Sequence, residues 1–467
     1  MMRAQGLAGL CRRVILGTKS LEKRWRRHWQ WLAVVALLAL IALDLVRVWR
    51  VTNHHDLDVF VLAARRLVAG EDIYADAAQF QAAIEAGTFS MKDETIVWPY
   101  AYGPLIAALF VPALWMPYPL VQAIWWGANT VTLGLGSWLC LRAAGPATPG
   151  RIAFVLLLLY RFEPTVVTLR LGQIELMQYL LLAFALYALN RQTSFNPPPQ
   201  SKGRAKLVCS WESWAGIALG LAAGVTFFPA ALIALLVWRR RWRAAAWAVA
   251  TAVVTIVGPF ALVGWDALGR YLSFASLYGI GGAFAAFPLN QSLNGFFSRN
   301  LMRNVFSATL KGLHLPWLAR GLTLGGDGAI IRGSAWLTWH RRGWPASPDE
   351  EERQRFSLEY GLAILALLMV SPHSQVYTFV WALIALIVLG LSWLARPTAL
   401  WEWVGLLVAY LLLGRNLVLF RPGLTRFVQA HYLFGALILW GIMGLKLWQR
   451  MRTRGKGDEV GRRTSTE

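Results

Sequence analysis

Charged residues are scarce in this sequence of 467 residues: they make up 15% of the chain, whereas 57% of it is hydrophobic. Since soluble proteins carry about a quarter charged residues, the composition excludes an ordinary soluble globular protein. Acidic residues are the rarer kind, with 24 Asp and Glu against 46 Lys and Arg, a formal net charge of +22. The basic residues fall in short clusters between apolar runs, as in the cytoplasmic loops of membrane proteins. We therefore interpret the charge as a topology signal and expect no nucleic-acid partner.

Cysteine and the common metal and nucleotide motifs are also lacking. The three cysteines, Cys11, Cys140 and Cys209, are widely spaced and odd in number, so they supply neither a disulfide framework nor a metal ligand set. There is no His-x-x-x-His pair and no Gly-x-x-x-x-Gly-Lys phosphate loop, so zinc chemistry and nucleotide hydrolysis lose support. We expect no cofactor.

Long apolar runs account for most of what is present. The first, residues 31–48, is about one bilayer span long and lacks a small-residue cleavage site, so we expect it to remain as a membrane anchor. The basic segment 1–30 precedes it and places the N-terminus in the cytoplasm by the positive-inside rule. The further predicted spans are 119–142, 151–170, 173–190, 214–238, 244–264, 318–339, 357–371, 376–394, 400–419 and 428–447.

These runs predict an all-α integral membrane protein, a polytopic bundle of about twelve transmembrane helices in the cell membrane with both termini cytoplasmic. Residues 31–448 form the bundle, and 449–467 form a polar cytoplasmic tail. The count of twelve requires 214–238 to be a pair of short helices that meet at Pro229, and a single span is the competing interpretation.

Two segments between the spans are assigned to the outer side. Loop 53–117 is too polar to cross the membrane as a whole, and its apolar piece 105–116 has the length of an interfacial helix. Loop 265–317 is moderately polar and rich in Gly and Phe. The basic stretch 191–210 belongs in the cytoplasm. No repeat of roughly 20–50 residues recurs, and the two halves show no matching interrupted helices, which weakens a transporter interpretation.

On this topology the informative polar residues collect on the outer side. Asp56 and Asp58 follow the first span, at the start of a short amphipathic helix closed by Gly70. Acids at the mouth of an apolar segment carry a desolvation cost, which suggests that they are used. The structural alternative is that Asp56 merely caps this helix. On the same side we expect Tyr100, Tyr102, Arg161, Glu163, Arg170, Gln173, Glu175, Asn290, Asn294, Arg299 and His373.

Several of these residues also have structural interpretations. Arg161 and Glu163 would lie well inside the bilayer, where they either face a cavity or form a mutual salt bridge that only stabilises the bundle. Asp44 lies three residues before Arg47, and we expect a structural pair. His373, in an outer turn, is more often a hydrogen-bonded turn residue than a ligand. The Asp-x-Asp pattern offers two hard oxygens to a divalent cation, but so short a pattern arises easily by chance.

In their order and spacing, the polar motifs resemble the family 87 glycosyltransferases, which have the GT-C fold. The resemblance covers about residues 30–395 and rests on Asp56-Leu57-Asp58-Val59-Phe60, Tyr100-Ala101-Tyr102-Gly103-Pro104-Leu105, Gly172-Gln173-Ile174-Glu175, Asn290-Gln291-Ser292-Leu293-Asn294-Gly295 and Ser371-Pro372-His373-Ser374. It implies a membrane enzyme that takes a sugar, usually mannose, from a polyprenyl phosphate and adds it to a lipid or glycan acceptor outside the cytoplasm. It also implies that Asp56 is the general base.

The reaction that the resemblance implies assigns roles to the candidates. The catalytic candidates are Asp56 and Asp58. A leaving phosphate needs cations, and arginine binds phosphate bidentately, so the candidates for the donor phosphate are Arg161, Arg170, Arg299 and His373. The candidates for other substrate contacts are Tyr100, Tyr102, Gln173, Glu175, Asn290 and Asn294. Attack opposite the phosphate predicts inversion, with an α-linked product from a β-linked donor.

The sequence departs from the family pattern at three places. Thr226 stands where the family often has Lys, Glu175 where it often has Asn, and Gln375-Val376-Tyr377 where an aromatic or His pair is usual. Arg161, Arg170 or Arg299 would then replace the missing cation. Two other interpretations stay open: a membrane transporter or lipid flippase, supported best by Arg161 and Glu163, and an inactive scaffold that kept the fold.

Overall fold

The computed structural model describes residues 2–86, 88, 98–191, 210–304, 306, 314–339, 350–394, 398–415 and 428–464. Within these residues all regular structure is helical, apart from one isolated antiparallel bridge between Asn290 and Gln375. The predicted all-α class is therefore confirmed. Most of the predicted basic loop 191–210 lies outside the described residues.

The helices follow one another along the whole chain. In order they are α1 (Met2–Arg50), α2 (His55–Ala69), α3 (Asp76–Glu85), α4 (Pro104–Leu109), η1 (Val111–Trp115), α5 (Tyr118–Ala143), α6 (Pro149–Leu159), α7 (Glu163–Leu171), α8 (Glu175–Arg191), α9 (Trp211–Val225), η3 (Phe228–Ala231), α10 (Leu232–Trp238), α11 (Trp242–Val263), α12 (Trp265–Ser276), α13 (Leu293–Leu301), α14 (Pro316–Thr338), α15 (Glu350–Val370), η5 (Val376–Trp381), α16 (Ala382–Leu394), α17 (Leu400–Gly414), η6 (Val428–Ala430) and α18 (His431–Thr464). The predicted terminal segments 1–30 and 449–467 continue α1 and α18 without a break over the described residues.

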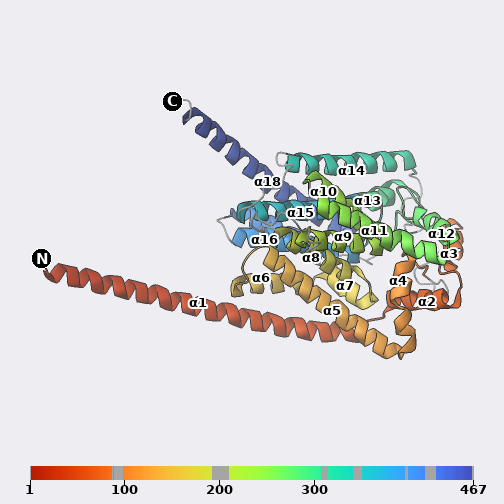
Figure 1. Cartoon of the computed structure of the whole chain (residues 1–467), viewed down its shortest axis with the longest axis horizontal. Coiled ribbons are helices and arrows are strands. Elements are labelled where there is room, and N and C mark those ends of the chain that lie inside the picture. Colours follow the sequence, from red (N-terminus) through yellow and green to blue (C-terminus); the bar gives the residue numbers. More distant parts are fainter. Residues whose placement is uncertain are drawn as a thin grey trace, which may run out of the picture.

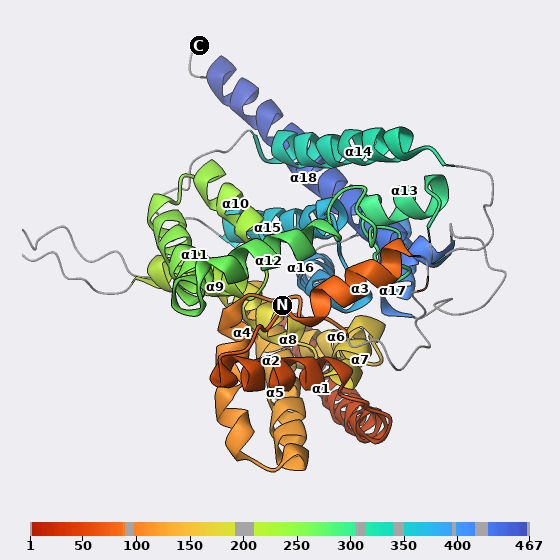
Figure 2. The same ribbon diagram turned by 90° about the vertical axis from the view of Figure 1, so that its right-hand side faces the viewer.

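The two ends of the bundle differ in what they carry. In Figure 1 the N-terminal part of α1 and the C-terminal part of α18 project at the same end of the molecule, while α2, α3, α4 and α12 gather at the opposite end. Figure 2 faces this second end and shows α12 and α3 close to each other, with α2 below them. The two segments predicted as outer loops, 53–117 and 265–317, thus contribute α2, α3, α4 and α12 to the end opposite the termini.

Four stretches in the described part of the chain are long and apolar enough to cross a membrane: Arg27–Arg50, Trp242–Val263, Val376–Leu394 and His431–Met451. They coincide with four predicted spans. A fifth is possible if α6 and α7, which are bent by 60° at their junction, count as one. By these criteria the predicted count of twelve is not confirmed. Helices such as α8 and α17 are short, and α14 carries Asp327 and Arg332 within its length.

The segment predicted to break at Pro229 is broken there. Helix α9 ends at Val225, Thr226 is extended, and Pro229 is the second residue of the short 3-10 helix η3 before α10. Proline has no N–H to continue a helix, which explains the break. Before it, Gly216 and Gly220 allow α9 to pack closely on α11, since a Cβ at either would lie 2.3 and 2.6 Å from α11 carbonyl oxygens.

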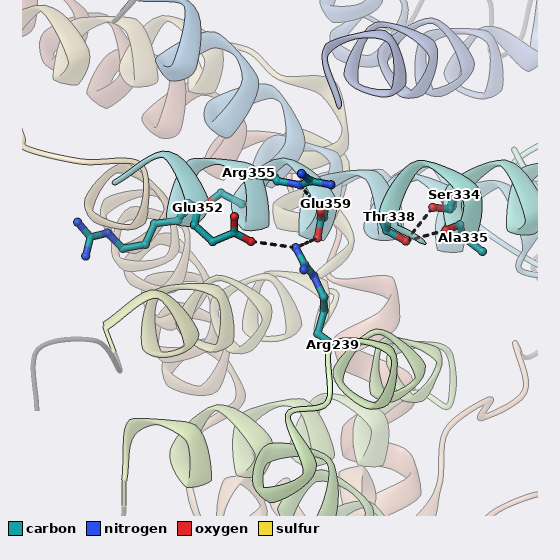
Figure 3. A network of polar contacts seen from close by, with 9 residues as sticks. Arg239, Ser334, Ala335, Thr338, Glu352, Arg355 and Glu359 are labelled. Carbon is teal, nitrogen blue, oxygen red and sulfur yellow. Dashed lines mark hydrogen bonds and ion pairs between the residues drawn. The ribbon is translucent and has the colours of Figure 1, made fainter. Parts of the chain in front are cut away.

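In the Arg-rich turn after α10, Arg239 and Arg241 are buried, whereas Arg240 is exposed. Arg239 forms ion pairs with two acids of α15, Glu359 and Glu352, the latter at 3.6 Å, and Arg355 Nε lies 3.0 Å from Glu359 (Figure 3). Arg241 lies over the ring of Phe356 at 4.9 Å. A buried charge is tolerated when it is paired, and this network joins the end of α10 to α15.

The core has a main part and a smaller outer part. The main part surrounds α16, whose residues from Ala382 to Trp393 are all buried. The outer part joins α2, α4 and α12 through apolar residues that include Leu57, Phe60 and Ile106. Because Leu57 and Phe60 are fully buried, the rotation of α2 about its axis is set by this packing. The rotation decides which polar residues of α2 face inward.

Candidate active site

The start of α2 is held by the end of α7. The backbone N–H groups of Asn53 and His54 both donate to the carbonyl of Arg170, each at 3.1 Å. Gly172, just after α7, has φ of 73°, and a Cβ there would lie 3.0 Å from the Leu57 Cβ. Glycine is thus needed both for the left-handed backbone and for the close approach of α2. This clamp places the first turn of α2 beside the Gly172 motif.

Asp56 lines a cavity of about 410 Å³, which we call the catalytic cavity. Four of the predicted site residues line it, namely Asp56, Tyr102, Arg170 and Gln173. Oδ2 of Asp56 is buried and has no hydrogen-bond partner among the described residues. Helix α2 begins at His55 and has no side-chain cap, so the capping role considered for Asp56 is wrong. Asp56 lies inside the first turn, where the helix dipole favours an ionised carboxylate.

Burial raises the pKa of Asp56 to about 7, and the nearby Asp58 adds to the rise, while hydrogen bonding from Gln173 opposes it. Tyr102 fixes Gln173, because its hydroxyl donates to Gln173 Oε1 at 2.8 Å. The Ile174 N–H donates to the same oxygen at 3.3 Å, so the amide NH₂ of Gln173 is the group left for Asp56. A carboxyl group with a pKa near neutrality suits proton acceptance from a hydroxyl.

The structure separates the two predicted catalytic acids. Asp58 is exposed, does not line the catalytic cavity, and accepts a hydrogen bond from the hydroxyl of Tyr118 at the start of α5. Residues two apart on a helix point to different faces, so Asp56 and Asp58 cannot both face the cavity. Asp58 instead ties α2 to α5.

Tyr100 and Glu175, both predicted substrate contacts, also lie outside the lining of the cavity. Tyr100 is buried, donates to the Gly103 carbonyl at 2.7 Å and accepts from the Ala107 N–H at 2.9 Å. It therefore supports the turn that carries Tyr102. Glu175 is buried at the first residue of α8.

The side chains of Asn290, Asn294 and Arg299 donate hydrogen bonds to backbone carbonyl groups and do not face the cavity. Nδ2 of Asn290 donates to the Pro372 carbonyl at 3.1 Å, and Nδ2 of Asn294 donates to it at 2.9 Å. Arg299 is buried and donates to the carbonyls of Phe287, at 2.9 Å, and Asn290. None of the three lines the catalytic cavity. In this geometry they hold the turn at residues 371–375, whose Gln375 does line it.

His373 stands behind the cavity wall. Its Nε2 lies 2.9 Å from Nε2 of Gln375, and its ring contacts Tyr278 and Phe287. Burial and the neighbouring Arg299 lower the pKa of His373 to about 3. The imidazole is therefore neutral near pH 7, so it supplies no positive charge to a phosphate. This agrees with the alternative of a hydrogen-bonded turn residue.

A second cavity of about 530 Å³ adjoins the catalytic cavity, with which it shares Glu163 and Arg170. We call it the arginine cavity, because its lining includes Arg47, Arg161, Arg170 and Arg415. Two predicted charge pairs concern this region. Arg161 Nε lies 3.5 Å from Asp44 Oδ1, so the ion pair of Asp44 is with Arg161 and not with Arg47 as expected. Arg161 has φ of 53° at the bend between α6 and α7, and this backbone conformation directs its side chain toward α1. Arg161 therefore pairs with Asp44 of α1 and not with its neighbour Glu163.

Sequence reasoning missed several cavity residues. His55, Tyr278, Gln375 and Tyr377 line the catalytic cavity. Arg415 lines the arginine cavity, although it lies inside the predicted span 400–419. An arginine within a span was itself a signal of function. Thr226, where the family often has Lys, does not line either cavity and instead accepts a hydrogen bond from Gln178 Nε2 at 2.8 Å.

No group of three or more His, Cys, Asp or Glu side chains that could hold a metal ion occurs in the described part of the chain.

Comparison with known proteins agrees with the motif resemblance. The sequence model of Glycosyltransferase family 87 matches residues 100–372, more than half of the chain. A protein of Mycobacterium tuberculosis (strain ATCC 25618 / H37Rv) named polyprenol-phosphate-mannose-dependent alpha-(1-2)-phosphatidylinositol mannoside mannosyltransferase is 26% identical over 391 residues. The alignment covers 78% of this chain and 77% of that protein.

Proposed function

The chain belongs to glycosyltransferase family 87, and we propose that it transfers mannose from a polyprenyl-phosphate donor to a glycolipid acceptor with Asp56 as the general base. Family membership makes it a membrane glycosyltransferase. The mannose, the polyprenyl carrier and the glycolipid acceptor are inferred from the name of the mycobacterial relative. The observation that carries the assignment of Asp56 is its position: a buried carboxyl oxygen without a partner among the described residues, on the wall of a cavity that also contains Arg170.

In the proposed reaction the acceptor hydroxyl lies within about 3 Å of Asp56, which takes its proton. The hydroxyl oxygen attacks the anomeric carbon, and the bond from that carbon to the phosphate oxygen breaks. Attack from the face opposite the phosphate inverts the anomeric centre. Tyr102 and Gln173 orient Asp56 through the hydrogen bonds described above. No nucleotide is needed, because the phosphate ester of the lipid already activates the sugar.

The developing charge on the leaving phosphate requires cations. We propose Arg170 and Arg161 for this role, since Arg170 lines both cavities and Arg161 lines the one beside it. Arg299 and His373 are then positioning residues, because they hold the turn at residues 371–375 and do not line the catalytic cavity. We place the catalytic end on the extracytoplasmic side, because the basic terminal segments, expected in the cytoplasm, project from the opposite end.

The transporter or flippase alternative drew its support from Arg161 and Glu163. These residues lie at the bend between α6 and α7, and discontinuous helices are common at transporter sites. Membership of a glycosyltransferase family favours an enzyme instead.

The test is sugar transfer in membranes that contain the wild type, Asp56→Asn or Asp58→Asn. The donor is radiolabelled polyprenyl-phosphate mannose, and the acceptor is a phosphatidylinositol mannoside. We expect Asp56→Asn to lose about 10²–10⁴-fold in rate, the usual contribution of general base catalysis. Asp58→Asn is the matched control on the same helical turn, and it should keep most of the activity. Full transfer by Asp56→Asn would remove this residue as the base.

A further inference from the structure

The arginine cavity has more positive charge than its own acids balance. Its charged lining residues are four arginines, from α1, from the bend between α6 and α7, from the end of α7 and from the residue after α17, and two acids, Asp44 and Glu163, so that its formal net charge is +2. Among the described residues, the guanidinium groups of Arg47, Arg170 and Arg415 form no hydrogen bond or ion pair. Three arginines from distant parts of the chain therefore share one cavity without a protein partner.

The position of this cavity favours a ligand carried by a lipid. One wall is α1, whose Leu40, Leu43 and Val46 are 43%, 57% and 51% exposed within a stretch able to span a membrane. The uncharged lining residues are Val48 of α1, Val51 just after its end, and Val166 of α7. A phosphate on a membrane lipid could thus enter sideways past α1, while its ester oxygen points toward Arg170 and the catalytic cavity.

We propose that the arginine cavity binds the phosphate of the lipid carrier in the form in which the reaction releases it, with Arg47 and Arg415 as ligands in addition to Arg161 and Arg170. The inference rests on the proposed function. The donor is a phosphodiester with one negative charge. When the sugar leaves, both electrons of the broken carbon–oxygen bond stay with the phosphate, and the proton of the acceptor goes to Asp56. The monoester that results carries a second charge near pH 7, because the second pKa of such phosphates is about 6.

The formal charge of the cavity, +2, balances the two negative charges of the released monoester better than the single charge of the donor. Groups that bind charge more strongly as it develops lower the barrier rather than only tightening substrate binding. The contact between Arg161 and Asp44 fits this role, since it is long, at 3.5 Å, and the Arg161 side chain is 53% exposed. The Asp44 side chain is only 13% exposed, so the weakness of this pair follows from its length, and a phosphate that lies closer to the Arg161 guanidinium can replace Asp44 as its partner.

The test uses the full-length protein in lipid nanodiscs and two probes on the same lipid: a short-chain polyprenyl monophosphate and its methyl phosphodiester, which has one charge less. Dissociation constants are measured by calorimetric titration for the wild type, Arg47→Gln and Arg415→Gln. Arg50→Gln is the matched control, because Arg50 is exposed on the same helix but does not line the cavity. We expect the wild type to prefer the monophosphate, and each cavity variant to bind it about tenfold more weakly with a reduced preference. The control should bind like the wild type.

Equal binding of the two probes by the wild type, or unchanged binding by both cavity variants, would overturn the inference. So would tighter binding of phosphatidylinositol than of polyprenyl monophosphate at this site, since the cavity would then serve the acceptor. All three variants replace exposed side chains, and melting temperatures equal to the wild type would confirm that they fold. The titration involves no sugar transfer. A wild type that binds the monophosphate as expected but transfers no mannose would therefore contradict the proposed function and leave the phosphate site in place.

Discussion

Replacing Gln173 by Met should move the pH dependence of catalysis, because Gln173 is the group that opposes the rise in the pKa of Asp56. Asp56 acts in its deprotonated form, so the rate falls as the pH drops below its pKa. In the wild type we expect kcat/KM to fall below a pH of about 7, the value to which burial raises the pKa of Asp56. Met keeps a similar length and buried volume but donates no hydrogen bond.

The size of the shift follows from the hydrogen bond that is lost. A hydrogen bond to a charged group contributes about 1.5–3 kcal/mol, and one pKa unit corresponds to about 1.4 kcal/mol. Loss of the bond favours the neutral acid, so the pKa of Asp56 should rise by about one unit or more. The fall in kcat/KM then begins at a higher pH, and activity at pH 9 suffers much less than activity at pH 7.

The assay measures kcat/KM for the polyprenyl-phosphate mannose donor between about pH 5.5 and 9.5, with detergent-solubilised protein and a saturating concentration of acceptor. Tyr102→Phe is the companion variant, since it keeps Gln173 but removes the hydroxyl that fixes the amide at 2.8 Å. It should shift the profile in the same direction by a smaller amount. If Gln173→Met lowers kcat/KM equally at every pH, or shifts the midpoint of the profile to lower pH, the reasoning is refuted. Gln173 would then be only a structural residue.

Three further predictions concern stability and can be checked by thermal unfolding. Gly172→Ala should lower the free energy of unfolding by about 1–2 kcal/mol, because the left-handed backbone there disfavours a Cβ and Leu57 leaves it little space. Gly70 has a similar φ but nothing within 4 Å of a Cβ, so Gly70→Ala separates the effect of the backbone from that of the contact with Leu57. Gly220→Val should lower the melting temperature, since a Cβ would lie 2.5 Å from Thr251 Cβ on α11, whereas Gly258→Val has open space around it; equal losses would contradict the packing argument. Arg239→Gln should destabilise by about 3–5 kcal/mol by leaving Glu359 in the fully buried network without this partner, and an unchanged melting temperature would show that the network of Figure 3 contributes little.

Much of the helical framework could be predicted from the sequence, because hydropathy and proline are local signals. The anchor at 31–48, the helix of residues 55–69 with its closing Gly70, and the break at Pro229 all occur where they were predicted. The predicted count of about twelve spans is not confirmed by helix length and composition. Charged residues inside helices such as α14 leave a composition that does not by itself show whether a helix crosses the membrane or packs within the bundle.

The roles of the polar residues were harder to predict, because a motif does not show which way a side chain points. Asp56 and Asp58 form one motif, but helical geometry turns one into the cavity and the other toward Tyr118. Asn290 and Asn294 read as substrate contacts, yet both amides bind the carbonyl of Pro372, about 80 residues away in the chain.

The order of amino acids by itself determined that this protein is a helical membrane protein, which family motifs it carries, and that Asp56 opens the helix after the first span. Only the tertiary structure decided that Asp44 pairs with Arg161, and that Arg47 and Arg415 meet beside the catalytic cavity. The physical reason is range: burial and backbone preference act over a few neighbouring residues, whereas a cavity is built by side chains that the packing of α1, α7 and α17 brings together from hundreds of residues apart.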